Sequence, residues 1–363
     1  LISGGSSKGE KDYTAFVIEE LGRIIVNGMA TIPGKTTILG DIGGKPVIGM
    51  PGYPIANYTV LREIVLPLFS WYGCEVPEFP KIRVTLGGMV QSSAGFEEFV
   101  QAIVGKVQDK WIAVPFPRGA GRQMHVVRSH AFLKVPANKK TLKTGEATDA
   151  HLTVPHTMAE QVVLVTGSHD PAIDYLADLA KDAGIHIASS HVGSMNGLAA
   201  LRQGFCHLAP MHLLSDDGEY NTPYLKKHFS EEELVLICIG ERIQGIVSRE
   251  ILGFDDILTH RFINRQKGSG TRMLLDHLLK KKRIDPGMID GYDEEVPTHL
   301  GVCLAVKNGD ADLGMTIYSA ARAFSLPFVP VDVERYELVT TKSMFEKDTR
   351  IRVLAEMIKS QKF

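Results

Sequence analysis

Cysteine is scarce in this chain, and its cysteines are too far apart to form a framework. The four of them, at positions 74, 206, 238 and 303, include no Cys-x-x-Cys pair. This spacing argues against a zinc ribbon and a disulfide-stapled fold, and it favours a reducing compartment. The 13 histidines show no His-Glu-x-x-His or comparable ligand spacing. We therefore expect a cytoplasmic protein without a metal cage of its own.

A surplus of charge of one sign is also missing. Lysine and arginine total 40 against 42 for aspartate and glutamate, and the basic run at 280–283 is typical of a solvated helix end. We therefore expect no nucleic-acid partner. The longest apolar runs, such as Leu234–Ile239, are too short to cross a bilayer, so we expect no membrane span. The start, Leu1-Ile2-Ser3, has neither a basic leader nor an initiator Met, so we expect a chain cut from a longer one.

The 363 residues are enough for two or three domains, and 44% of them are hydrophobic, as in ordinary globular proteins. Composition divides the chain into three parts and predicts an α/β fold class. We expect a partial α/β domain over 1–72, a small all-β domain built as an antiparallel barrel or sandwich over 73–154, and a two-lobed α/β domain over 156–363.

In the first part, the spacing of apolar residues predicts helices over Tyr13–Leu21, ending at Gly22, and over Asn57–Phe69, with a strand over Pro46–Met50 between them. In the second part, β-branched and aromatic residues predict several short strands. These are Ile82–Leu86, Phe99–Val107, Trp111–Val114, His125–Val127 and Ala131–Val135, with a final strand within Thr141–Pro155.

The third part repeats a strand, a Gly-Ser pair and a helix three times. The pairs are Gly167-Ser168, Gly193-Ser194 and Gly268-Ser269, and Asp170 and Pro171 suit the cap and first position of the first helix. A helix start offers unpaired N–H groups and a partial positive charge, so three converging starts could bind an oxyanion without lysine or arginine. The alternative is that each Gly-Ser pair only makes a tight turn and a cap.

Several motifs of the third part resemble the periplasmic-binding-protein-like domain (LysR substrate-binding-like) that is found fused to molybdenum-cofactor biosynthesis proteins. They are Gly167–Pro171, Gly193–Leu201, Gly218–Asn221, Arg242–Gly245, Asn264–Arg272, Gly291-Tyr292, Glu295, Thr298-His299, Gly309–Gly314 and Glu334–Val339.

This domain is similar, more distantly, to binding proteins for molybdate. That similarity implies an anion held by Ser168, Ser194 and Tyr318, to which the 268–271 loop adds Ser269 and Thr271. Molybdate or tungstate is the implied ligand. Arg265 and Arg272 flank the third loop and either contact the anion or pair with acidic residues. His169 lies beside Ser168, but the sequence shows no third group to orient a serine–histidine nucleophile.

The front of the chain resembles the molybdopterin molybdotransferase (MoeA) family. The run Ser3–Tyr13, Pro33-Gly34-Lys35 and Gly49–Pro54 carry the resemblance. It implies that molybdate is transferred to adenylylated molybdopterin with release of AMP, that Mg²⁺ assists, and that the protein is a homodimer. It also assigns Asp12 to the metal-insertion site, with a catalytic role, and assigns the pterin or its phosphate to Ser3, Gly4, Gly5, Gly9, Lys35 and Gly52.

Three positions depart from the family's pattern. Gly28 and Ile32 stand where the family has lysines, and Gln101 falls where it has an arginine. Neutral replacements remove the stabilisation of anionic substrates. Two readings follow: a molybdotransferase-like protein with a fused oxyanion-binding domain, or a non-catalytic protein that senses molybdate or a pterin. We expect this chain alone to lack molybdotransferase activity. A transcriptional effector domain is a third reading, which no helix-turn-helix or basic face supports.

Overall fold

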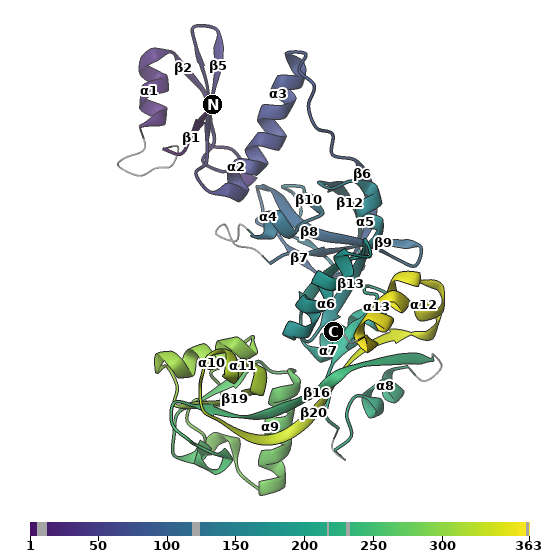
Figure 1. The fold of residues 1–363 in the computed structure, drawn as a ribbon. Helices are drawn as coiled ribbons and strands as arrows, with labels where there is room; N and C mark the ends of the chain where they lie inside the picture. The colour runs from purple at the N-terminus through teal and green to yellow at the C-terminus, as the bar shows by residue number, and fades with distance from the viewer. Residues whose placement is uncertain (6–12, 118–123, 216–217, 230–232, 361–362) are drawn as a thin grey trace. The chain divides into compact units, whose positions relative to one another are not determined.

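The computed structural model describes residues 1–5, 13–117, 124–215, 218–229, 233–360 and 363. These residues form two compact units, Leu1–Val162 and Val163–Phe363 (Figure 1). None of the helices within the described ranges is long and apolar enough to cross a membrane. The three-part division of the chain stays a prediction.

Unit 1 begins with a four-stranded sheet in the order β1-β5-β4-β2, in which only the pair β1–β5 is parallel. The predicted helix over Tyr13–Leu21 and the predicted strand over Pro46–Met50 are confirmed as α1 and β5. Helix α1 ends before Gly22, where a Cβ would lie 2.1 Å from the carbonyl oxygen of Asp41, so only glycine permits this approach. The elements are β1 (Ile2–Ser3), α1 (Thr14–Leu21), β2 (Arg23–Asn27), β4 (Ile38–Ile42) and β5 (Lys45–Met50).

The predicted second helix is a continuous helical segment made of α2 (Pro54–Val60), a π-helical turn η1 (Leu61–Val65) and α3 (Leu66–Trp71). Pro67 lacks an N–H and cannot continue the ordinary ladder, and the wider turn just before it accommodates the proline. From η1 the buried guanidinium of Arg62 lies 3.0 Å from the ring centre of Phe132, and Glu63 pairs with Lys134 at 2.5 Å. These contacts join the helix to the strands that follow.

Those strands form a closed barrel, one of the two predicted forms. Five strands close because β8 pairs with both β9 and β10, and β3 adds to the edge of β8. The pair β6–β9 is parallel, so the expectation of a purely antiparallel domain is wrong. The members are β3 (Thr31–Ile32), β6 (Lys81–Leu86), β8 (Glu97–Val107), β9 (Lys110–Pro115), β10 (Ala131–Val135) and β12 (Ala147–Leu152), flanked by the pair β7 (Val90–Gln91) and β11 (Thr141–Leu142) and by α5 (His156–Glu160).

The predicted strand at His125–Val127 is wrong, because the chain forms the short helix α4 (Met124–Arg128) there. Three residues are too few for alternation to be told from a helical period, so β-branched content alone misled the prediction. In this helix the His125 ring stacks on the Phe116 ring, with ring centres 4.5 Å apart.

Unit 2 has two lobes joined by two long strands, β16 (Leu234–Ser248) and β20 (Phe328–Thr341), which run side by side through both (Figure 1). The first lobe contains β13 (Val162–Gly167), α6 (Pro171–Lys181), β14 (His186–His191), α7 (Ser194–Arg202), β15 (Ala209–Met211), α8 (Thr222–His228), α12 (Lys342–Lys347) and α13 (Thr349–Lys359). The second contains η2 (Phe254–Leu258), β17 (Phe262–Arg265), α9 (Gly270–Lys282), η3 (Pro286–Met288), β18 (Glu295–Val296), α10 (His299–Asn308), β19 (Leu313–Ile317) and α11 (Tyr318–Ala323).

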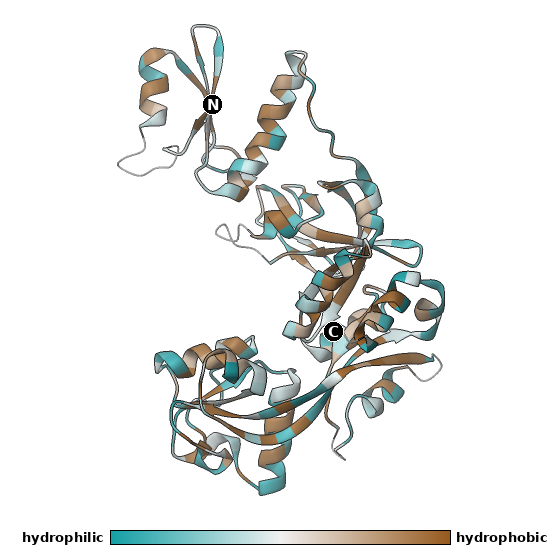
Figure 2. Ribbon diagram, viewed as in Figure 1, coloured by the Kyte–Doolittle hydropathy of each residue, from teal (hydrophilic) through white to brown (hydrophobic). Residues whose placement is uncertain are grey.

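The three predicted strand–loop–helix units are confirmed as β13–α6, β14–α7 and β17–α9. Asp170 caps α6 by accepting a hydrogen bond from the N–H of Ala172 at 2.8 Å, and Pro171 is its first residue, as expected. Hydrophobic residues follow the strands of unit 2 (Figure 2), and in the second lobe they form two buried clusters, one against α9 and one against α10 and α11. The main sheet runs β15-β20-β16-β19-β17-β18, so the middle of the two long strands passes between the lobes.

The barrel core generates a first prediction. Leu86 is fully buried among apolar side chains, so Leu86→Ala should lower the free energy of unfolding of unit 1 by about 2–5 kcal/mol. Met89→Ala is the matched control, because Met89 is 55% exposed, and it should change stability by no more than about 0.5 kcal/mol. Urea unfolding followed by tryptophan fluorescence measures this, since Trp71 and Trp111 both lie in unit 1. Equal midpoints for the two variants would contradict the assigned core.

Candidate functional site

The glycine loop at the start of unit 1 is described in part, and Gly9 and Asp12 lie outside the described residues. Ser3 ends β1 and is followed by Gly4 and Gly5, and the Gly4 N–H donates to the carbonyl of Met50 at 3.0 Å. A Cβ on Gly52 would lie 3.8 Å from the Cα of Gly4, so two of the predicted pterin-binding segments are adjacent. Lys35 is exposed, with its Nζ 5.2 Å from the ring centre of Phe96.

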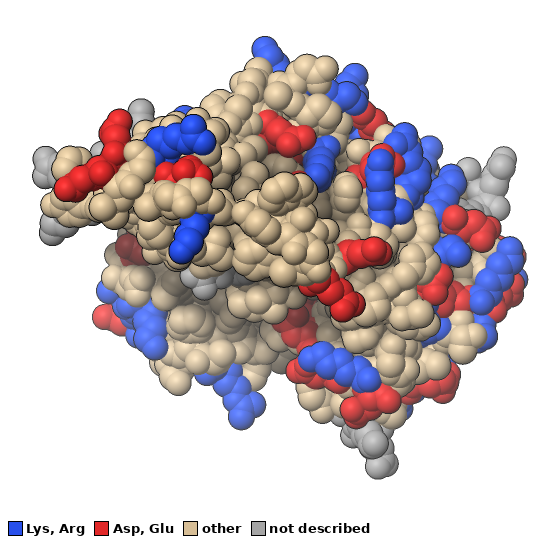
Figure 3. All heavy atoms as spheres, turned by 90° about the horizontal axis from the view of Figure 1, so that it is seen from above, with Lys and Arg blue, Asp and Glu red and all other residues tan. Residues whose placement is uncertain are grey.

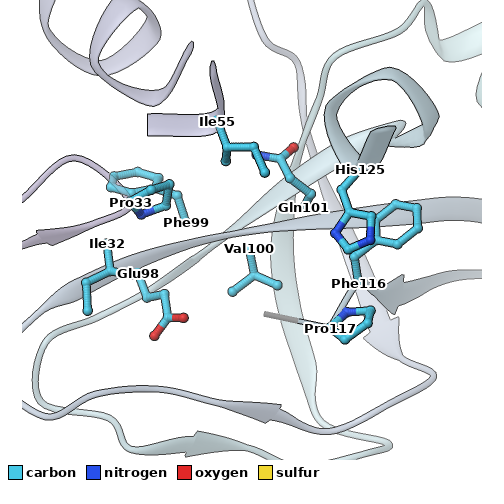
Figure 4. A pocket seen from close by; sticks show the side chains of 10 residues that line it. All are labelled: Ile32, Pro33, Ile55, Glu98, Phe99, Val100, Gln101, Phe116, Pro117 and His125. Carbon is cyan, nitrogen blue, oxygen red and sulfur yellow. The ribbon is translucent and has the colours of Figure 1, made fainter. Parts of the chain in front are cut away.

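A cavity of about 160 Å³ lies in the same unit, and two of the three departing positions, Ile32 and Gln101, line it (Figure 4). Its other walls are mostly apolar or aromatic. Gln101 accepts a hydrogen bond from the Ser129 hydroxyl at 3.1 Å, and its buried amide nitrogen has no partner. The full lining is Ile32, Pro33, Ile55, Glu98, Phe99, Val100, Gln101, Phe116, Pro117 and His125.

The Mg²⁺ ion that the resemblance implies finds no matching donor set in the part of the chain that is described. No three histidine, cysteine, aspartate or glutamate side chains lie close enough there to hold a metal ion. The described residues therefore do not fit the ion, and no step is derived through it.

In unit 2, the three Gly-Ser helix starts converge on His212, which follows β15. The Ser168 hydroxyl lies 2.7 Å from His212 Nε2, and the His212 N–H donates to Ser194 Oγ at 3.3 Å. At the start of α9, a Cβ on Gly270 would lie 2.1 Å from His212 Nδ1, so this helix can approach the ring only with glycine there. The convergence expected of the three loops is thus present, around a histidine.

His212 is fixed by a carboxylate on the long strand β20. Its Nδ1 lies 2.6 Å from Glu334 Oε2, and a carboxylate only accepts, so Nδ1 carries the hydrogen and Nε2 accepts from Ser168. Such a relay also activates nucleophilic serines. Here the three side chains belong to residues that are at most 5% exposed, so this conformation offers a substrate no approach to Ser168.

Arg242 completes the network from the neighbouring strand, where it stands opposite Glu334 in the register. Its guanidinium pairs with Glu334 and with Asp170 at 2.6 Å, and it lies 4.1 Å from the ring centre of Tyr336. Burial alone would raise the pKa of Glu334, but Arg242 and His212 outweigh it and lower that pKa to about 2. Glu334 is therefore ionised at neutral pH.

The predicted hydroxyl residues differ in what they can offer a ligand. The oxygens of Ser194, Ser269 and Thr271 each accept from a protein N–H: His212 N, Arg272 N and Gln244 Nε2, respectively. Because a hydroxyl has one proton, each of the three retains an O–H that can donate. Ser168 instead directs its proton at His212. A ligand that takes this proton has to displace that hydrogen bond.

Arg265 at the end of β17 is a buried cation without an acidic partner in the described part of the chain. The residue is 5% exposed, its Nη2 donates to the carbonyl of Pro297 at 3.2 Å, and its Nε and Nη1 have no partner. Burial, reinforced by Arg242, lowers the pKa of Arg265 to about 10, so it stays protonated at neutral pH. Arg272 takes the other expected role, since it pairs with Asp276 at 3.1 Å and Glu295 at 3.4 Å.

Tyr318 is not brought into this group by the contacts described. It is the first residue of α11, 47% exposed, and its ring packs edge-on against Phe328 with ring centres 5.4 Å apart. The remaining members lie around His212 on elements of both lobes. We call them the His212 cluster: Ser168, Ser194, His212, Arg242, Gln244, Arg265, Ser269, Thr271, His299 and Glu334.

Two arginines lie in the His212 cluster: Arg265 is buried, and the Arg242 side chain is 10% exposed. Sequence reasoning missed His212, Gln244 and Glu334. The last two lie in motifs that carried the resemblance, but nothing local gave them a role. The available signal was a polar residue at alternate positions of an apolar strand, as at Arg242 and Gln244.

Three family models match segments of the chain. Residues 1–71 match the model described as "Probable molybdopterin binding domain", and residues 83–153 match the MoeA C-terminal region (domain IV). Residues 176–359, half of the chain, match the PBP superfamily domain. The chain therefore belongs to the PBP superfamily and carries MoeA-type domains in front.

Three known proteins illustrate the likeness. The uncharacterized protein YvgK of Bacillus subtilis is 32% identical, over 47% of this chain and 57% of its own. A molybdopterin molybdenumtransferase of Staphylococcus epidermidis is 23% identical over 45% and 40%. The crystal structure of a molybdopterin biosynthesis MoeA protein from Pyrococcus horikoshii is 35% identical, with TM-score 0.35, over 42% and 37%. The chain thus spans between two-fifths and three-fifths of the two curated relatives.

The buried histidines predict how unit 2 responds to acid. The pKa values of His212 and His299 are lowered below the ordinary value of 6.5, chiefly by burial. As pH falls below about 6.5 the unfolded chain binds protons that the folded chain refuses, so stability is lost. Glu334 adds a further loss below pH 4.5, down to its folded pKa of about 2.

Calorimetry of the full chain from pH 8 to pH 5 should therefore show the unit 2 transition moving to lower temperature. The shift should be smaller in His299→Gln, which removes one of the two groups. A transition temperature that does not change over this range, or an equal shift in both proteins, would contradict the buried neutral histidines.

Proposed function

We propose that this chain acts in molybdenum-cofactor biosynthesis and that its PBP-like domain binds an anion at the His212 cluster. One observation carries the proposal: Arg265 is charged and buried, and no carboxylate of the described residues pairs with it. Burying an unpaired charge is costly, and an anion between the lobes would offset that cost. The O–H groups of Ser194, Ser269 and Thr271 supply further donors.

The ligands that suit the pathway are molybdate, tungstate and a phosphate-bearing pterin. All are anions whose oxygens accept hydrogen bonds from a guanidinium and from hydroxyls. If all donors of the site were neutral, the site would be expected to select one oxyanion over others. With Arg265 present, charge attraction contributes as well, and the choice among anions depends on the other polar groups of the cluster.

For the front of the chain we favour the non-catalytic reading over the molybdotransferase. Supporting it, Ile32 and Gln101 line one mostly apolar cavity, where cations would stabilise molybdate, adenylate or pyrophosphate. The face shown in Figure 3 carries lysine and arginine interspersed with aspartate and glutamate. The homodimer, the cytoplasmic location and the roles of Asp12, Gly9, Lys35 and Gly52 stay predictions.

The anion proposal is tested by titration calorimetry on the full chain with molybdate, tungstate and phosphate. Arg265→Gln should weaken each anion that binds by about tenfold or more, the typical effect of losing a charged donor. Arg261→Gln is the matched control, since Arg261 is half exposed and pairs with Glu294, and it should leave binding unchanged. If none of the three anions binds at millimolar concentration, or if Arg265→Gln binds as well as the wild type, the proposal fails.

The non-catalytic reading predicts no turnover. Incubating the full chain with adenylylated molybdopterin, molybdate and Mg²⁺ should release no AMP above background, because the cationic side chains are replaced. The molybdenumtransferase from Staphylococcus epidermidis serves as the positive control. Comparable AMP release by both proteins would restore the molybdotransferase reading.

A further inference from the structure

Two buried acceptors in the His212 cluster have no donor among the residues that the structure describes. Gln244 is fully buried on β16; its Nε2 donates to Thr271 Oγ1 at 3.0 Å, and its Oε1 has no partner. Its amide also hydrogen-bonds the Glu334 carboxylate, which only accepts. The nitrogen must therefore face Glu334 and Thr271, and the bare atom of the side chain is the oxygen.

The second acceptor is His299, the first residue of α10 and 3% exposed. The Thr316 hydroxyl donates to the carbonyl oxygen of His299 at 3.2 Å, and Thr316 Oγ1 lies 3.2 Å from His299 Nδ1. With its proton already used, Thr316 accepts from Nδ1–H, so Nε2 is the bare nitrogen, and it has no partner. Burial, with Arg265 nearby, keeps the pKa of His299 well below its ordinary value, so the ring stays neutral.

Both acceptors lie close to Arg265 in the sheet. Gln244 stands opposite Ile317 of β19, the residue after Thr316, and β19 also pairs with β17, which ends at Arg265. Strands β16 and β17 and the start of α10, which contacts Thr316 of β19, therefore present one bare cation and two bare acceptors to the same region. A ligand that has only acceptor oxygens can satisfy Arg265 but neither Gln244 nor His299.

We propose that the ligand of the His212 cluster carries an O–H or N–H donor beside its negative charge, and that Gln244 Oε1 and His299 Nε2 accept it. This inference rests on the proposed function, namely that the cluster binds an anion. Gln244 and His299 are then specificity-determining residues. They favour protonated oxyanions, of which hydrogen phosphate and hydrogen arsenate are the simplest, over sulfate, molybdate and tungstate, which have no proton at neutral pH.

The physical basis is the cost of an unsatisfied acceptor. A fully deprotonated oxyanion has no hydrogen to donate, so the two bare acceptors would stay without a hydrogen bond when it binds. Each buried group left unpaired costs about 1–3 kcal/mol. That cost corresponds to roughly five- to hundredfold in affinity for each acceptor. Sites built to pair with a ligand's hydrogen reject analogues that lack it far better than apolar pockets reject a change of size.

The test is titration calorimetry of the full chain at pH 7.5 with phosphate, arsenate, sulfate and molybdate as probes. We expect phosphate and arsenate to bind at least about tenfold more tightly than sulfate and molybdate. Gln244→Met and His299→Gln should each reduce this preference by about fivefold or more, through weaker phosphate binding. His260→Gln, at a histidine bonded locally to Thr259 and Asp256, is the control and should keep the preference.

The outcomes separate the two proposals. Sulfate or molybdate binding as tightly as phosphate, or a preference unchanged in both Gln244→Met and His299→Gln, overturns this inference but leaves anion binding in place. Absence of binding by all four probes overturns both. Thermal unfolding of each variant by circular dichroism identifies a change that only unfolds the domain. If one variant unfolds, the other still decides the result.

Discussion

The carboxylate of Glu334 is the shared partner of the buried polar side chains in unit 2. It orients His212 through Nδ1, pairs with Arg242 and accepts from the Gln244 amide, and through His212 it directs the proton of Ser168. These partners come from both lobes' connecting strands and from the loop after β15, and His212 is 122 residues away in the sequence. Removing one member of such a buried charged network leaves others unpaired, which costs several kcal/mol.

Beside this network lie further buried polar side chains. Arg265 has no acid, and Gln244 and His299 keep bare acceptors although all three are buried. Folded chains pair nearly all such groups, and violations gather where a ligand completes the structure. The Glu334 network gives the domain a fixed frame, and the unpaired atoms beside it give a ligand its place. In unit 1, Ile32 and Gln101 are neutral side chains and give the cavity no cation for an anion.

Local signals predicted the elements that local interactions decide. The Asp170–Pro171 cap of α6 and the Gly-Ser starts of α7 and α9 could be read directly, because a cap needs only neighbouring residues. The closure of the barrel and the pairing of Arg242 with Glu334 depend on strand register between distant segments, which periodicity does not encode. His125–Val127 shows the limit within one element, because three β-forming residues are too few to distinguish a strand from a helix.

The central claim is that an anion completes the His212 cluster beside Arg265. Crystals of the full chain grown with arsenate test it most directly, since arsenic can be located by its anomalous scattering. The account predicts an anomalous peak within hydrogen-bonding distance of the Arg265 guanidinium, with Gln244 Oε1 or His299 Nε2 near one oxygen. Arsenate absent from the cluster while Arg265 turns to a carboxylate of the protein would contradict the claim.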